Sequence, residues 1–247
     1  MLEQIVVVCL FLALGGIMKG ATGMGTPVIA VPALAAYFDV PFAIAILVVP
    51  NIATNGWQMF RYRAECHNLH FVGRFAVAGS LGALIGTLLL IELPGDILSL
   101  GLAAIIILYI GLRLAHPTWR VTPRLARIAS APIGLISGIL QGATGISAPV
   151  SATFLNAMQL ARPQFMLAIS ALFIGFVVIQ LPALAIAGIL TWDRLLLSVL
   201  AVLPIAAAMP AGAWLARTLN PQTFDRVVLV FLAGMAAKLI YDSGLFD

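Results

Sequence analysis

Hydrophobic residues run along the chain in long blocks that short polar connections separate. The blocks cover residues 4–37, 42–60, 71–91, 97–114, 128–156, 164–188, 194–216 and 223–241. Within each block the apolar residues are continuous and do not alternate, which favours helices over the strands of a transmembrane barrel. Several blocks approach or exceed the ~20 residues that a helix needs to cross a bilayer. The pattern predicts an all-α integral membrane protein with eight apolar segments.

The first block is too long for one straight transmembrane helix. Its 34 residues would extend about 50 Å, whereas the hydrocarbon core of a bilayer is about 30 Å thick. Glycines and Pro27 interrupt the block, and both residue types disfavour a continuous helix. We therefore expect a broken helix, in pieces of about 16 and 12 residues that do not span the membrane alone.

The interrupting stretch occurs twice. Residues 16–27 read GIMKGATGMGTP and residues 138–149 read GILQGATGISAP, so both follow G-I-x-x-G-A-T-G-x-x-x-P at an offset of 122 residues. We call them the first and second cassettes. Gly212 also matches Gly86 with a small insertion. These matches predict an internal duplication, as is common in secondary transporters. The predicted parts are a first membrane repeat over 1–114, a basic cytoplasmic linker over 115–127 and a second membrane repeat over 128–247, with about four apolar segments in each repeat.

Charge predicts the orientation of the connections. Loops 61–74 and 115–127 together hold six of the 13 Lys and Arg residues, and the turn at 92–96 is acidic, so the two loops are expected in the cytoplasm. If each cassette segment crosses the membrane, the halves are parallel; if each is a re-entrant hairpin, the halves are inverted. The hairpin arrangement places ten Lys and Arg residues inside and two outside, against nine and three for the crossing arrangement. We favour inverted repeats with re-entrant segments and leave the crossing arrangement open.

The cassettes suggest a binding chemistry. A helix broken inside a bilayer exposes backbone groups that need protein or a wet cavity around them. The helix that follows the break begins with unpaired N–H groups and partial positive charge, and glycines allow a ligand close to the backbone. If the two cassettes face each other at the membrane midplane, they form a donor-rich site that suits a small oxyanion. The alternative is that the glycines only permit tight helix packing.

Lys19 is the most distinctive candidate. It lies in the first cassette between apolar residues, and no Asp or Glu lies at depth in any predicted span. Because charge inside a membrane is costly and usually functional, an anionic ligand would complete an ion pair with this residue. The alternative is that the Lys19 side chain snorkels to an interface. Its counterpart in the second cassette is Gln141, a neutral donor, so the two copies are not equivalent.

Amide side chains add further candidates. Asn51 and Asn55 share a helix face and would either reach a ligand or bridge helices. Gln180 matches Gln58 at the offset of 122 residues. The full set of expected substrate-binding residues is Lys19, Gly20, Thr22, Gly23, Thr26, Asn51, Asn55, Gln141, Gly142, Thr144, Gly145, Ser147 and Gln180.

Composition narrows the classes of protein. Only 9% of the 247 residues are charged and 62% are hydrophobic, whereas soluble domains carry about 25% charged residues. The net charge of +4 therefore indicates topology and not nucleic-acid binding. Cys9 and Cys66 have no metal or redox spacing, and Glu3 before the first block argues against a cleaved signal peptide. We expect no enzyme motif, cofactor or metal. The expected partners are a small anion and the lipid bilayer, with a homodimer left open.

The twin cassettes, the eight apolar segments and the basic central linker resemble the TauE/SafE family of bacterial membrane transporters. The resemblance covers essentially the whole chain. It implies export of small sulfur-containing anions, such as sulfite, sulfoacetate or other organosulfonates, across the bacterial cytoplasmic (inner) membrane. The residues themselves point to a small oxyanion and to alternating access around the cassettes, but not to sulfur. Two alternatives are a passive anion channel and a non-transporting membrane protein that assists assembly of a respiratory or thiol-redox complex.

Overall fold

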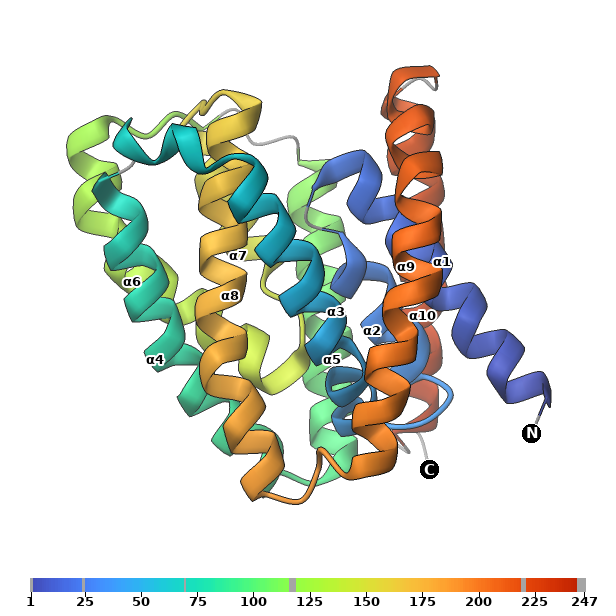
Figure 1. Ribbon diagram of the computed structural model, residues 1–247. Coiled ribbons are helices and arrows are strands. Elements are labelled where there is room, and N and C mark those ends of the chain that lie inside the picture. Colours follow the sequence, from blue (N-terminus) through green and yellow to red (C-terminus); the bar gives the residue numbers. More distant parts are fainter. Residues whose placement is uncertain (1, 24, 69, 116–118, 219–220, 244–247) are drawn as a thin grey trace. The chain divides into compact units, whose positions relative to one another are not determined.

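The computed structural model describes residues 2–23, 25–68, 70–115, 119–218 and 221–243, and every regular element among them is a helix (Figure 1). The elements are α1 (Leu2–Thr22), α2 (Thr26–Ala35), α3 (Val40–Arg61), η1 (Arg63–Asn68), α4 (His70–Glu92), α5 (Gly95–Leu114), α6 (Pro123–Thr144), α7 (Ala148–Ala157), α8 (Arg162–Ile186), α9 (Trp192–Thr218) and α10 (Pro221–Asp242). The all-α prediction is confirmed. Within the described ranges, six helices are long and apolar enough to cross a membrane, namely α3, α4, α5, α6, α8 and α9.

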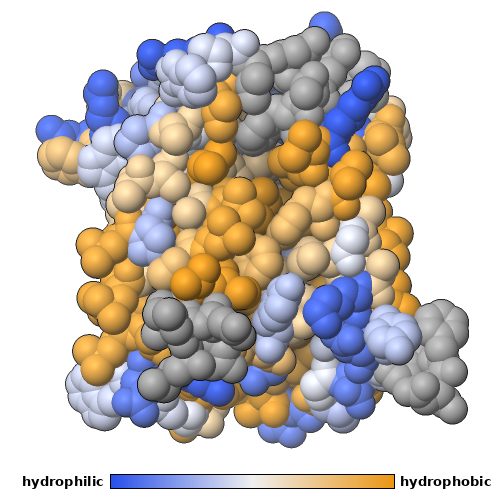
Figure 2. Space-filling view, turned by 90° about the vertical axis from the view of Figure 1, so that its right-hand side faces the viewer, coloured by the Kyte–Doolittle hydropathy of each residue, from blue (hydrophilic) through white to orange (hydrophobic). Residues whose placement is uncertain are grey.

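The surface is that of a membrane protein. Figure 2 shows hydrophobic side chains over much of the face in view. Large apolar side chains are exposed on the protein surface, with 89% of Ile186 and 73% of Val230 accessible. Such a surface is unfavourable in water and favourable against lipid chains. The chain is therefore a multi-pass membrane protein.

The helices form two compact units that do not coincide with the two halves of the sequence. The first unit comprises Met1–Pro50, Leu93–Leu114 and Thr191–Asp247, and the second comprises Asn51–Glu92 and Ala115–Leu190. Each unit therefore takes helices from both sides of the basic linker. The repeat boundaries at 1–114 and 128–247 stay a prediction from the sequence, and each compact unit contains helices from both of these segments.

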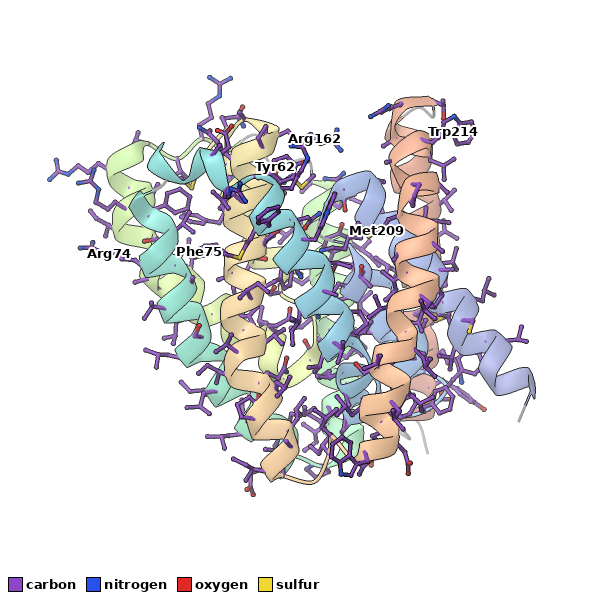
Figure 3. All side chains as sticks on the ribbon, in the orientation of Figure 1. Tyr62, Arg74, Phe75, Arg162, Met209 and Trp214 are labelled. Carbon is purple, nitrogen blue, oxygen red and sulfur yellow. The ribbon has the colours of Figure 1, made fainter. Side chains whose placement is uncertain are left out.

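In the first unit α1 packs along α9. A Cβ on Gly16 would lie 2.9 Å from Cα of Ile205, and one on Gly20 would lie 2.8 Å from the carbonyl carbon of Met209, which is labelled in Figure 3. The residue numbers rise together, so the two helices run parallel. Glycine is required at both positions because backbone fills the space that a side chain would need.

In the second unit α6 packs along α4 by the same kind of contact. A Cβ on Gly138 would lie 2.9 Å from the carbonyl carbon of Gly79, and one on Gly142 would overlap the carbonyl oxygen of Ala83. These helices also run parallel. At the offset of 122 residues Gly138 and Gly142 are the counterparts of the glycines that line α1, so both repeats use the same face of their first helix.

The partner helices match as well. A Cβ on Gly86 of α4 would overlap the carbonyl oxygen of Ile139, and one on Gly212 of α9 would overlap that of Ile17. Ile17 and Ile139 are equivalent in the two cassettes, and Gly86 and Gly212 are the pair matched by sequence. The contacts thus agree with the predicted duplication. The first helix of the first predicted repeat, α1, packs on α9 of the second, and the first helix of the second, α6, packs on α4 of the first.

Each cassette separates a long helix from a short one, and the pair folds back on itself. The amide N–H of Val121, just before α6, donates to the carbonyl of Ala157 at the end of α7 over 2.9 Å. In the first unit the ring of Tyr37, which follows α2, lies 5.5 Å from that of Phe11 in α1. The end of each short helix therefore lies beside its long partner, and the two helices form a hairpin.

The helix breaks are where the sequence predicts them, but the longer piece of each pair exceeds the expected length of about 16 residues. The expectation that neither piece spans the membrane alone is wrong for α6, which is long and apolar enough to cross it. α1 has 21 residues and α2 has 10, while α6 has 22 and α7 has 10. The long helices continue past the apolar run into polar residues, which include Glu3 in α1 and Arg124 in α6. These residues can lie at the membrane interface, so helix length exceeds the length of the apolar part.

Pro50 lies inside α3 and removes one helical hydrogen bond. Proline has no N–H to donate to the carbonyl of Ile46, four residues earlier. The hydroxyl of Ser198 in α9 donates to that carbonyl over 2.8 Å and accepts from the N–H of Val49 over 3.0 Å. One buried hydroxyl therefore bonds to both a carbonyl and an amide group in the helical turn before Pro50.

Candidate functional site

The two cassettes end their first helix with the same backbone geometry. Gly23 has φ 87° and Gly145 has φ 74°, both in the left-handed region that glycine adopts without strain. The N–H of Gly23 donates to the carbonyl of Lys19 over 2.7 Å, and that of Gly145 donates to Gln141 over 2.8 Å. These two glycines are therefore explained by the turn that stops the helix.

The cassette threonines bond to their own helices. Thr22 Oγ1 donates to the carbonyl of Met18 and Thr144 Oγ1 donates to that of Leu140, both over 2.8 Å. Their hydroxyl hydrogens are therefore engaged with their own helices. The Thr144 oxygen also accepts, because the N–H of Ile146 donates to it over 3.4 Å.

Gly20 and Gly142 face neighbouring helices. The helix packing described above needs glycine at both positions, without any ligand. This agrees with the packing interpretation of the cassette glycines, and a role for these two in substrate binding stays a prediction.

Lys19 is buried, with 1% of its surface exposed. Its Nζ donates to the carbonyl of Gly23 over 3.3 Å, at the C-terminal end of α1 where the helix carries partial negative charge. The side chain does not extend to the protein surface, which argues against the snorkelling alternative. A cation held in this way inside an apolar helix pair is a candidate for ligand binding.

Thr26 is the first residue of α2 and has 2% of its surface exposed. Its Oγ1 has no hydrogen-bond partner among the residues that the structure describes, and Gly25 caps the helix without a side chain. Thr26 packs against Gly15, since a Cβ there would lie 3.3 Å from its Cγ2. Gly15 is one helical turn before Lys19. The start of α2, a buried hydroxyl and the ammonium group thus occur together in the first unit.

The second cassette carries amide groups in place of the charge. Gln141 has 2% of its surface exposed, and its Oε1 accepts no hydrogen bond within the described residues. Gln180 of α8 donates through Nε2 to the carbonyl of Gly142 over 3.3 Å, so the structure brings it to the cassette. Ser147, which precedes α7, accepts from the hydroxyl of Ser151 over 3.3 Å.

Asn51 and Asn55 are both buried in the second unit. Asn55 Nδ2 donates to the carbonyl of Asn51 over 2.9 Å, one turn earlier in α3. Gln58, on the same helix, accepts from the hydroxyl of Ser170 in α8 over 3.0 Å. Gln58 therefore bridges α3 and α8, while ligand contact and helix bridging by the two asparagines both stay predictions.

The candidates fall into two sets. Lys19, Gly20, Thr22, Gly23 and Thr26 belong to the first unit, and Asn51, Asn55, Gln141, Gly142, Thr144, Gly145, Ser147 and Gln180 belong to the second.

One residue was missed from the sequence. Ser137 is fully buried, and its Oγ has no partner in the described part of the chain. It precedes Gln141 by four residues, and this spacing on one helix face was the available signal.

An all-helical multi-pass protein with duplicated broken helices and a buried intramembrane cation has the features of a secondary membrane transporter. A profile described as sulfite exporter TauE/SafE matches residues 8–239. The chain belongs to this family, whose members are transporters, and the resemblance seen in the sequence is confirmed. No curated protein and no solved structure matches the chain.

Proposed function

We propose that this protein is a secondary transporter that exports small anions such as sulfite, sulfoacetate or other organosulfonates across the bacterial inner membrane by alternating access. The observation that carries the proposal is the buried Lys19, whose Nζ donates to the carbonyl of Gly23, three residues before α2 begins at Thr26. Family membership supports the substrate class.

The chemistry of the first cassette fits an oxyanion. The ammonium group of Lys19 supplies charge, the first N–H groups of α2 supply donors with partial positive charge, and Thr26 Oγ1 supplies a hydroxyl with no partner among the described residues. A small oxyanion presents several acceptors around one negative centre. It can therefore take hydrogen bonds from all three groups, which a cation or an apolar solute cannot do.

The test is flux into proteoliposomes. Sulfite, sulfonates and carboxylates are compared with and without a pH gradient, using wild type and Lys19→Ala. Because charged hydrogen bonds contribute about 1.5–3 kcal/mol, transport efficiency should fall roughly 10- to 150-fold. Lys19→Arg should retain part of the activity. Lys238→Ala is the matched control, since it removes an exposed lysine paired with Asp242.

Each alternative has its own outcome. If Lys19→Ala transports as well as wild type, the assignment of this residue is wrong. A channel would show conductance without saturation, and an assembly factor would show no flux of any anion.

We also propose that α1–α2 and α6–α7 are re-entrant hairpins in inverted repeats. The hydrogen bond between Val121 and Ala157 supports this, because it places the end of α7 beside the start of α6, at one end of the second unit. Arg162 then starts α8 at that end, and Figure 3 draws it near Tyr62, which follows α3. This matches the side that the hairpin arrangement assigns to Arg162.

The last helices of the repeats support the inversion. α5 and α10 end the first and second repeats, and they pack together in the first unit. In Figure 1 they run in opposite directions. Equivalent helices of parallel repeats would run the same way, whereas those of inverted repeats run oppositely.

A cysteine-labelling experiment tests the topology. Arg162→Cys and Asp96→Cys are made in a chain that lacks Cys9 and Cys66, and a membrane-impermeant maleimide is added outside intact cells. Only the cysteine at position 96, in the acidic turn, should react. Labelling at position 162 from outside would show that α6–α7 crosses the membrane.

A further inference from the structure

Two side-chain oxygen atoms on one helix of the second unit are buried without a hydrogen-bond partner among the described residues. They are Ser137 Oγ and Gln141 Oε1, on side chains with 0% and 2% of their surface exposed. Both belong to α6 and are four residues apart, so they lie on one face of the helix. Across the described residues, the only other such side-chain atom is Thr26 Oγ1 in the first unit. Because buried polar atoms nearly always have partners, this pair calls for an explanation.

The equivalent position in the first cassette carries a charged group. Gln141 corresponds to Lys19 at the offset of 122 residues. There the ammonium group lies at the C-terminal end of α1 and donates to the carbonyl of Gly23 over 3.3 Å. The C-terminal end of α6 carries the same partial negative charge, since α6 stops at the same αL turn. The first repeat thus has a covalently attached cation at this position, whereas the second has the amide of Gln141, with the hydroxyl of Ser137 one helical turn earlier.

We propose that the second unit binds a monovalent alkali cation, Na⁺, with Ser137 Oγ and Gln141 Oε1 among its ligands. Hydroxyl and amide oxygens are hard ligands that suit such an ion, and C-terminal ends of broken helices coordinate Na⁺ in other transporters. The ion gives the second repeat the positive charge that Lys19 gives the first. This role in anion transport rests on the proposed function, but binding of the ion does not.

The bound ion also fits the asymmetry of the cassettes. A lysine at position 141 would be a built-in cation, as in the first repeat. A glutamine keeps the position neutral and offers an acceptor, so the charge there depends on a ligand. Neither oxygen atom belongs to a carboxylate, which indicates a weakly held, exchangeable ion.

Binding is measured on the purified full-length protein with ²²Na⁺, displaced by NaCl, KCl or choline chloride at constant ionic strength. We expect saturable binding that NaCl displaces and choline chloride does not. Ser137→Ala should weaken it at least tenfold, and Gln141→Lys should abolish it. Gln141→Glu keeps the oxygen and adds charge, so it should tighten binding. Ser170→Ala, a buried serine of the second unit that bonds to Gln58, is the control and should bind as wild type does.

The outcomes separate the ion from bound water. Absence of saturable ²²Na⁺ binding to wild type, or equal binding by Gln141→Lys, refutes the site and assigns the two oxygen atoms to water. The opposite response of Gln141→Glu keeps the test decisive if Gln141→Lys does not fold.

Flux measurements separate this inference from the proposed function. Wild-type anion flux should increase with Na⁺, and Gln141→Lys should lose that dependence. If Na⁺ binds but no anion is transported by any variant, the proposed function fails and the cation site stands. If anions are transported by wild type without Na⁺ binding, the cation site fails and the proposed function stands.

Discussion

Replacing Ser198 with alanine should destabilise the first unit through the backbone of α3. Ser198 is fully buried, and its hydroxyl makes the two hydrogen bonds that the turn at Pro50 needs. Without the hydroxyl, the carbonyl of Ile46 has no helical donor because Pro50 lacks an N–H. The N–H of Val49 also loses its acceptor at Ser198.

The magnitude follows from the number of bonds. Hydrogen bonds between membrane helices contribute about 0.6 kcal/mol on average and up to about 1.7 kcal/mol, so two bonds give roughly 1–3 kcal/mol. The upper part of the range is expected here, because water cannot replace the lost partner at a site with no exposed surface.

The assay is reversible unfolding in mixed detergent micelles, followed by circular dichroism as the fraction of denaturing detergent rises. Ser80→Ala is the matched control, since its hydroxyl donates to the carbonyl of Ala76 within its own helix over 2.8 Å. Loss of that bond leaves a carbonyl that still has its helical donor. The control should therefore lower the free energy of unfolding by less than about 0.5 kcal/mol.

A double mutant tests the cause. Pro50→Ala restores an N–H that can donate to Ile46, so Ser198→Ala should cost at least ~0.5 kcal/mol less in that background. If Ser198→Ala costs the same with and without Pro50, the hydroxyl does not compensate for the proline and the reasoning is refuted.

Two further substitutions probe the helix pair and the cassette of the first unit. Gly20→Ala should lower the free energy of unfolding by about 1–3 kcal/mol, because its Cβ would overlap the backbone at Met209, which cannot move aside. Gly101→Ala, at a position with open space around it, should raise the free energy of unfolding by roughly 0.5–1 kcal/mol. Equal effects of Gly20→Ala and Gly101→Ala in the same unfolding assay would contradict the α1–α9 packing. Thr26→Val removes a hydroxyl that has no partner among the described residues, so it should leave the unfolding midpoint unchanged or higher while raising the KM for the anion. An unchanged KM would remove Thr26 from the proposed site.

Local features of the fold could be predicted because their causes are local. The glycines and Pro27 stop and restart the first helix whatever surrounds them, so the break appears where the sequence places it. The expected ends of the other helices are also close to the observed ones. The lengths of α1 and α6 could not be predicted, because a helix can continue beyond the apolar run into polar residues.

The pairing of helices could not be predicted from one sequence. The predicted duplication indicates which helices would be equivalent, but not that α1 packs on α9 while α6 packs on α4. The same glycine pattern would also fit packing within one predicted repeat, of α1 on α4 and of α6 on α9. The pattern alone therefore does not distinguish packing within a repeat from packing between repeats.

The candidate site was predictable in part. An apolar run around Lys19 indicates a buried cation, and the structure buries it. From the sequence, Gln180 was a candidate only because it matches Gln58 at the offset of 122 residues. Its hydrogen bond to Gly142 could not be predicted. Ser137 was missed because a serine in an apolar helix usually bonds to its own backbone; its spacing of four residues from Gln141 was a signal, but the absence of that backbone bond is seen only in the structure.

The packing of α1 on α9 and of α6 on α4 also sets an order of assembly during synthesis. Gly82 of α4 meets Leu135 of α6 about 50 residues later, which takes roughly 3–10 s at 5–20 residues per second. Gly16 of α1 must wait for Ile205, about 190 residues later, or roughly 10–40 s. The second unit therefore completes its main helix pair before the first unit does. The helix that is synthesised first, with the only lysine of the cassettes, is among the last to reach its partner.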